Sequence, residues 1–431
     1  MKFFFGIIIL LIVYGCSLNP NSKIWTSTTK IAKEDTLIIK YITEKEEILN
    51  KELNVGLKIN LINSINKNRN SANLTNNIYS KYDGSFKEKS KYKFSKIKKF
   101  HQYEPEITFV GEDIVFFDNK GSILKFNKNS KLIWKKNYYK KVEIKNNPIL
   151  FFSNNSDILI VADTLAKIYA LDLKTGKLIW SKTSDSPFNS QIKILKDKLF
   201  VADAQNSIHC FSLKDGKKLW KFNTDKPLIK SQKKLSLVVK DNKVIFNNSI
   251  GDITAINILD GKLIWQTPTQ SSKIYREAMF LNTSDLILRN NSLIFSNNTN
   301  NLYSIDIDTG TVIWKQNINS SLRPVSIDEF ILTVTNEGYF VVVNEEGNLI
   351  RSTYLLKNIK KKIRKKIKFT GFVVGGENIY LSSSNGRLFI VNISTGKISD
   401  ILKIDNEKIT RPLIHKNNLY ITKNNSVIKL N

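Results

Sequence analysis

Short apolar runs alternate with polar turns from about residue 92 to the C-terminus. Runs such as residues 158–162 and 199–202 hold four or five apolar residues and end at Asp, Asn, Gly or Lys. Runs of this length, bounded by turn residues, are typical of strands buried on both faces. No segment of 10–15 residues shows the apolar period of 3.6 that a packed helix requires. The pattern therefore predicts an all-β chain.

One unit that ends in Trp recurs along this region. Its clearest copies are IYALDLKTGKLIW at residues 168–180 and LYSIDIDTGTVIW at residues 302–314. Further copies lie at residues 123–134, 208–220 and 253–265, and two degenerate copies, at residues 339–351 and 388–400, end in Arg351 and Asp400. The ends of successive copies are 37 to 49 residues apart. A period of about 40–50 residues made of strands is typical of β-propeller blades with four antiparallel strands each.

Each copy fits a hairpin between the two outer strands of a blade. Asp172 ends one strand, where its carboxylate can accept hydrogen bonds from the turn. A glycine follows at the position that needs a positive φ, and the Trp ring then fills the gap between neighbouring blades. The structural repeat positions are Gly176, Gly216, Gly261, Gly310, Gly347 and Gly396, with Trp134, Trp180, Trp220, Trp265 and Trp314.

The two ends of the repeat region predict how the ring closes. After the seventh copy, residues 413–422 and 427–430 supply inner strands of an eighth blade, but no outer strand follows them. An orphan strand at about residues 92–97 precedes the first blade, and pairing it with the C-terminal strands would remove two exposed sheet edges. We therefore expect an eight-bladed propeller over residues 92–431. Seven blades plus a separate hairpin is the alternative.

The N-terminus predicts export and lipidation. Met1 and Lys2 precede an apolar run that ends at Gly15, which is too short to span a bilayer and indicates a signal peptide over residues 1–15. Gly15 and Cys16 resemble a bacterial lipobox, in which the cysteine is acylated, and Ser17 favours the outer membrane in that class. An ordinary signal peptide containing a cysteine is the alternative. Residues 16–91 are polar and are expected to form a flexible, mostly extended tether. Within it, residues 37–42 and 55–62 fit short strands that dock on a neighbour, and the run of Lys and Glu at residues 87–91 is interpreted as a solvated spacer.

The charge changes this picture little. The chain has 67 Lys and Arg against 38 Asp and Glu, a formal net charge of +29, but only eight of the cations are Arg. A polyanionic partner would explain the excess, and so would compositional background. Lysine also lacks the bidentate geometry that phosphate recognition favours, and an exported chain meets no cytoplasmic nucleic acid. Residues 357–368 concentrate eight cations, with Ile359, Ile363 and Ile367 at every fourth position. This segment is either a short amphipathic helix for an anionic surface or a solvated loop.

Candidate catalytic groups are scarce. His101, His209 and His415 are too far apart for a local metal motif, and His209 occupies the aromatic position of Tyr169 in the repeat. Cys210 occupies the position of Ala170, which favours a small buried residue over a reactive thiol. No nucleophile elbow, P-loop or His-Glu-x-x-His motif occurs. We predict no catalytic, cofactor or metal site.

The repeat resembles the pyrroloquinoline-quinone-type propeller repeat, and together with the lipobox the chain resembles the BamB family of outer-membrane assembly lipoproteins. The resemblance implies a non-enzymatic scaffold without a cofactor, anchored by its lipid at the periplasmic face of the outer membrane. Its implied partners are the periplasmic domains of the barrel subunit and other members of the β-barrel assembly complex. Partner contacts are expected in loops near residues 227–233 and 273–279.

Two other classes of protein share such a fold. A quinone-dependent periplasmic dehydrogenase resembles this chain in its repeat, but that class uses a vicinal Cys-Cys pair, which this sequence lacks. A glycan-binding propeller is the third possibility. Fold alone does not decide among these functions.

Overall fold

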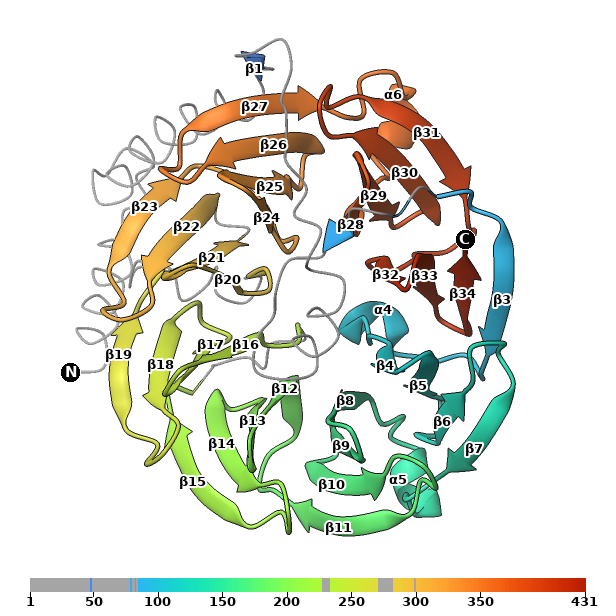
Figure 1. The fold of residues 1–431 in the computed structure, drawn as a ribbon, viewed down its shortest axis with the longest axis vertical. Coiled ribbons are helices and arrows are strands. Elements are labelled where there is room, and N and C mark those ends of the chain that lie inside the picture. The colour runs from blue at the N-terminus through green and yellow to red at the C-terminus, as the bar shows by residue number, and fades with distance from the viewer. Residues whose placement is uncertain are drawn as a thin grey trace, which may run out of the picture. The chain divides into compact units, whose positions relative to one another are not determined.

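The repeats form eight antiparallel sheets, arranged as blades around a common centre in a computed structural model (Figure 1). The structure describes residues 47–48, 78–79, 82, 84–226, 233–269, 282–297 and 300–431. The predicted fold class, an eight-bladed β-propeller of four-stranded blades, is confirmed, and the alternative of seven blades is wrong. No helix among these residues is long and apolar enough to cross a bilayer.

Blades 1 to 4 each run from an inner strand to an outer strand in chain order. Blade 1 holds β4 (Thr108–Val110), β5 (Asp113–Phe117), β6 (Ile123–Phe126) and β7 (Leu132–Lys136). Blade 2 holds β8 (Leu150–Asn154), β9 (Ile158–Asp163), β10 (Lys167–Asp172) and β11 (Leu178–Thr183). Blade 3 holds β12 (Phe188–Leu195), β13 (Lys198–Asp203), β14 (Ser207–Ser212) and β15 (Lys218–Asn223). Blade 4 holds β16 (Leu237–Lys240), β17 (Lys243–Asn247), β18 (Ile253–Asn257) and β19 (Leu263–Thr267).

Blades 5 to 7 repeat this order, and blade 8 departs from it. Blade 5 holds β20 (Ile287–Arg289), β21 (Ser292–Asn297), β22 (Asn301–Asp306) and β23 (Val312–Gln316). Blade 6 holds β24 (Val325–Ile327), β25 (Phe330–Val334), β26 (Tyr339–Asn344) and β27 (Leu349–Tyr354). Blade 7 holds β28 (Phe369–Gly375), β29 (Asn378–Ser383), β30 (Arg387–Asn392) and β31 (Ile398–Lys403). Blade 8 holds β32 (Leu413–His415), β33 (Asn418–Lys423), β34 (Ser426–Leu430) and β3 (Glu88–Lys93). The one-turn helices α4 (Phe100–Tyr103), α5 (Lys141–Ile144) and α6 (Lys361–Arg364) lie between blades.

The ring closes through β3, the outer strand of blade 8. β3 pairs antiparallel with the C-terminal strand β34, with Tyr92 opposite Val427 (Figure 1). The strand begins four residues before the predicted range of 92–97, and hydrogen bonds from the amides of Phe94 and Ile97 continue the contact beyond it. The run of Lys and Glu at its start suggested a solvated spacer. That interpretation is wrong, because an outer strand has one face in solvent and needs few apolar side chains.

Two further segments within the predicted tether also pair with the propeller. β1 (Glu47–Ile48) lies antiparallel along the outer strand β27 of blade 6. β2 (Ile78–Tyr79) lies parallel to the inner strand β28 of blade 7, opposite Val374 and Gly375. Short pieces of the predicted tether therefore add strands to two blades. The short strands expected at residues 37–42 and 55–62 lie outside the described residues.

The Trp side chains of the five repeats that end in Trp join neighbouring blades. Each indole nitrogen donates to a backbone carbonyl in the outer turn of the next blade, and each ring lies against the glycine of that turn. The donor–acceptor distances are Trp134 to Leu173 3.3 Å, Trp180 to Leu213 3.0 Å, Trp220 to Ile258 3.1 Å, Trp265 to Ile307 3.0 Å and Trp314 to Glu345 2.7 Å.

The two repeats that lack the Trp differ in their contact with the next blade. Arg351 replaces Trp in blade 6, and its guanidinium donates to the carbonyl of Ile393 in blade 7 at 3.0 Å, so the contact between blades is kept. Asp400 replaces Trp in blade 7 and is exposed. Blade 8 takes its outer strand from the N-terminal side, and therefore has no outer hairpin turn against which a Trp at position 400 could pack.

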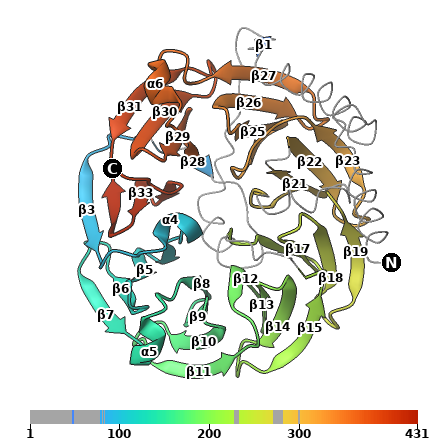
Figure 2. The same ribbon diagram turned by 180° about the vertical axis from the view of Figure 1, so that it is seen from behind.

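The strand order gives the ring two distinct faces. In an antiparallel blade, the connections from an outer strand to the next inner strand share a face with the turns between the two middle strands. We call this the connection face. Figures 1 and 2 show the ring from its two sides. The opposite face, the turn face, carries the turns of the inner and outer hairpins. α4, α5 and α6 all belong to the connection face.

Candidate functional site

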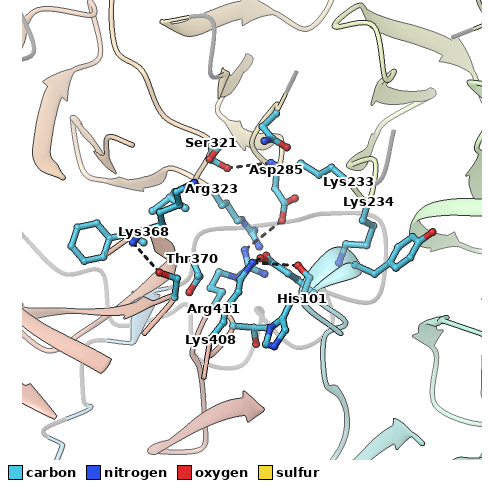
Figure 3. A pocket seen from close by; sticks show the side chains of 18 of the residues that line it. His101, Lys233, Lys234, Asp285, Ser321, Arg323, Lys368, Thr370, Lys408 and Arg411 are labelled. Carbon is cyan, nitrogen blue, oxygen red and sulfur yellow. Dashed lines mark hydrogen bonds and ion pairs between the residues drawn. The ribbon is translucent and has the colours of Figure 1, made fainter. Parts of the chain in front are cut away.

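A cavity of about 790 Å³ opens at the centre of the connection face. Most of its lining comes from residues at or just before the inner strands, which converge on the centre of the ring. Figure 3 shows the side chains around this space: His101, Lys233, Lys234, Asp285, Ser321, Arg323, Lys368, Thr370, Lys408 and Arg411. Residues from six blades and from α4 thus meet at one place, although they are spread over more than 300 positions of the chain.

Ion pairs tie the acidic side chains of this cavity to its cations. Arg411 contacts Glu106 at 2.5 Å and Asp285 at 3.4 Å. Lys234 contacts the second carboxylate oxygen of Glu106 at 3.2 Å, and Lys408 pairs with Glu104. Burial alone would raise the pKa of Asp285, but Arg411 and the neighbouring Lys234 and Arg323 hold it below its ordinary value. All three carboxylates are therefore neutralised from within the site.

A fully buried lysine lies near the charged residues of the cavity. The Lys193 side chain, on β12, is 0% exposed. Burial, together with the charges of Arg323 and Lys234, holds the pKa of its ammonium group well below the ordinary value, while Asp285 and Glu106 act in the opposite direction. A lysine in such surroundings disfavours its own charged form.

Replacing Lys193 with Met is expected to stabilise the propeller at neutral pH, by about 1–3 kcal/mol, because an apolar side chain of similar length avoids burying a charge. The unfolded chain holds this proton up to about pH 10.5, whereas the folded state releases it at lower pH. The free energy of unfolding of the native protein should therefore rise with pH in that window, and the advantage of Lys193→Met should shrink. Urea unfolding at pH 7 and at about pH 9.5 measures both effects. Lys174→Met, at an exposed position, is the control. A Lys193→Met protein less stable than the native chain at pH 7 would contradict this account.

The basic segment at residues 357–368 is a short insertion with a single helical turn. Ile367 is buried and Ile359 is partly buried, and both pack on the core between blades 6 and 7, while Ile363 is 48% exposed. Arg364 lies over the Tyr354 ring and donates to the carbonyls of Lys357 and Ile359. Of the two alternatives, the structure therefore favours the solvated loop, with one helical turn over Lys361–Arg364. The lysines of the segment are exposed on the connection face.

Cys210, His209 and His415 are buried, and their contacts favour structural roles. Cys210 is fully buried opposite Trp220, and burial raises the pKa of its thiol to about 12, so the small-residue interpretation agrees with the structure. His209 is buried, and its Nε2 lies 2.9 Å from a carboxylate oxygen of Asp203. Burial alone would raise the pKa of Asp203, but hydrogen bonds from His209 and backbone amides lower it. His415 stacks on Phe109.

The structure leaves several predicted positions outside its described residues. These are Cys16 with the signal peptide, and both loops expected to contact a partner, apart from Lys233, which lines the cavity. Within the described ranges, no group of three or more His, Cys, Asp or Glu side chains is arranged to hold a metal ion.

The outer strands of blades 1 to 5 expose one or two aliphatic side chains just before the Trp of the repeat. The exposed residues are Leu132, Ile133, Leu178, Ile179, Leu219, Leu263, Ile264, Val312 and Ile313, on blades 1 to 5. At blade 6 the corresponding strand β27 is paired with β1. The outer rim can therefore accept an added strand, as one blade already does within the chain.

The eight blades, their outer-turn glycines and the Trp contacts between them define a β-propeller built from pyrroloquinoline-quinone-type repeats. A family model described as outer membrane protein assembly factor BamB matches residues 119–353, more than half of the chain. The chain belongs to this family. No match was found among curated proteins at the level of sequence.

Solved structures similar to this chain share its fold at low sequence identity. BamB from Moraxella catarrhalis has a TM-score of 0.63 and 15% identity, covering 80% of this chain and 97% of that one. The quinohemoprotein alcohol dehydrogenase ADHIIG from Pseudomonas putida HK5 has a TM-score of 0.59 and 11% identity, covering 88% and 83%. The C-terminal WD40 domain of Sif2 has a TM-score of 0.58 and 11% identity, covering 82% and 99%. At these identities the likeness describes the fold alone.

Proposed function

We propose that this protein is a non-enzymatic scaffold lipoprotein of the outer-membrane β-barrel assembly machinery. In this role it is anchored by an acylated Cys16 at the periplasmic face of the outer membrane and docks on the periplasmic domains of the barrel subunit. The observation that carries the proposal is the match of the BamB family model over residues 119–353. The lipobox at Gly15 and Cys16 supports the anchor and the compartment.

The connection face is the docking surface in this proposal. The described ends of the connections from β15 to β16 and from β19 to β20 lie on that face, and residues 227–232 and 270–281 fall within these two stretches of sequence. The second stretch contains Lys273 and Arg276, which can form ion pairs with a partner. The outer rim gives a second mode of contact, because exposed edges can accept an extended segment of a client by strand addition.

Affinity purification of the acylated full-length protein from its native membrane tests the proposal. We expect the barrel subunit and other assembly components to co-purify. Reversing two charges, in Lys273→Glu with Arg276→Glu, should lower their recovery about tenfold, since a charge-assisted contact contributes about 1.4 kcal/mol or more. The matched control reverses Lys174 and Lys214, which are exposed in outer-hairpin turns of the turn face, and should leave recovery unchanged.

Two further experiments distinguish the proposed function from its alternatives. Cys16→Ala should release the protein from the membrane fraction, whereas an ordinary signal peptide predicts no change in fractionation. Adding pyrroloquinoline quinone with Ca²⁺ and an alcohol to the purified protein tests for dehydrogenase activity. Turnover of the alcohol, or failure of the acylated protein to recover any barrel-assembly component, would overturn the proposal.

A further inference from the structure

The central cavity carries a clear excess of positive charge. Its described lining includes six Lys and Arg side chains against three carboxylates, which are Glu104, Glu106 and Asp285. The three carboxylates are already paired with Lys408, Lys234 and Arg411. The space therefore has a positive potential that its own acidic groups do not cancel, and low-dielectric walls strengthen such a potential.

Most of these cations are held in place by the fold, while Lys368 is exposed. Arg323 is only 5% exposed just before β24, and the side chains of Lys234 and Arg411 are 13% and 11% exposed. The ammonium group of Lys233 donates to the carbonyl of Ser321 at 3.2 Å, which links the approaches to two inner strands. Fixed, partly desolvated cations bind anionic oxygen more strongly than mobile surface lysines, because less side-chain entropy is lost.

The cavity lies near the start of β28, and the added strand β2 lies near its other end. β2 lies beside Val374 and Gly375 at the end of β28, while the cavity lies beside Thr370 and Gly371 near its start. Tyr82, which follows β2, is buried against Tyr380. A ligand in the cavity would thus approach from the connection face.

We propose that this cavity binds a small ligand with two or more carboxylate or phosphate groups. Cations that converge from several blades favour a ligand with more than one anionic group over a single-charged one. Arg323 provides a planar donor group suited to carboxylate or phosphate oxygens. The volume of about 790 Å³ is within the range of small-molecule sites. This inference goes beyond the proposed scaffold function and does not depend on it.

Calorimetric titration of the purified full-length protein with citrate and with pyrophosphate tests this inference. We expect one site for at least one of the two probes, and a higher melting temperature in its presence, because a ligand of the folded state stabilises it. Binding of citrate alone identifies a polycarboxylate site, and binding of pyrophosphate alone identifies a phosphate site. Affinity should fall with added salt.

Matched variants place the binding in the cavity. Lys368→Gln removes a lining cation, and Lys365→Gln removes an exposed cation of the same segment that does not line the cavity. We expect Lys368→Gln to weaken binding about tenfold, equivalent to about 1.4 kcal/mol, and Lys365→Gln to leave it unchanged. Arg323→Gln should weaken binding of the probe at least as much. Circular dichroism checks that this variant keeps the native fold. Absence of binding by both probes up to about 10 mM, or equal effects of Lys368→Gln and Lys365→Gln, would refute the site.

Discussion

Replacing Glu88–Lys93 with a Gly–Ser segment of equal length is expected to lower the free energy of unfolding by about 5–10 kcal/mol. β3 is the only strand of blade 8 that comes from the N-terminal side, and its loss leaves the outer edge of β34 unpaired. Tyr92 accounts for much of the effect. It is 0% exposed, packs edge-on against Phe126 at 5.7 Å and donates its hydroxyl to the carbonyl of Lys128 at 3.0 Å. Losing a buried aromatic side chain costs about 3–5 kcal/mol, and each lost strand hydrogen bond costs about 1 kcal/mol more.

Single substitutions in β3 distinguish the loss of ring closure from a general destabilisation by any change in this strand. Tyr92→Ala should cost about 3–5 kcal/mol, while Lys91→Ala, at an exposed position of the same strand, should stay within about 0.5 kcal/mol. Urea unfolding measures these values, and hydrogen exchange of the Val427 and Ile428 amides shows whether β34 opens first. A replaced segment that melts like the native protein would mean that β3 does not hold the ring together.

The fold was predictable because each blade repeats the same local signals. In the sequence, the outer hairpin is recognised by an acidic residue at its turn, a glycine and a Trp. The closure of blade 8 by an N-terminal strand was predictable because that pairing removes two exposed sheet edges. The exact place of β3 was not predictable, since the charged run at its start has the composition of a linker and only Tyr92 faces the core.

A second repeated turn was overlooked in the sequence. Asp118, Asp163, Asp203 and Asn248 follow or end the second strand of their blades, and each side chain accepts hydrogen bonds from two amides of the next turn. These side chains stabilise the middle turns on the connection face. The signal was present, as an Asp or Asn at the same place in successive repeats, but it was weaker than the Gly and Trp of the outer hairpin.

The central cavity could not be found from the sequence. Its residues lie at or near the start of inner strands that are about forty positions apart, and none forms a local motif with another. Lys233 fell within a loop that was assigned to partner contact, and Lys368 ended a segment that was considered only as a surface patch. Only closure of the ring brings Arg323, Arg411 and Asp285 together, because convergence is a property of the tertiary fold.

Gly216→Ala is expected to cost about 2–5 kcal/mol through two separable effects. Gly216 has a φ of +69°, where an Ala costs about 1–2 kcal/mol. An added Cβ would also lie 2.5 Å from Cε3 of Trp180, so the ring that joins blades 2 and 3 must shift. Overpacking of this kind costs about 1–3 kcal/mol more.

Gly111 provides the matched control, since its φ is +62° and an added Cβ would meet nothing within 4 Å. Gly111→Ala should therefore cost only the backbone part, about 1–2 kcal/mol. In a Trp180→Ala background, Gly216→Ala should cost no more than Gly111→Ala, because the clash has been removed. Urea unfolding of the single and double variants completes this cycle. An unchanged cost of Gly216→Ala without Trp180 would show that the close approach of ring and turn does not couple the two blades.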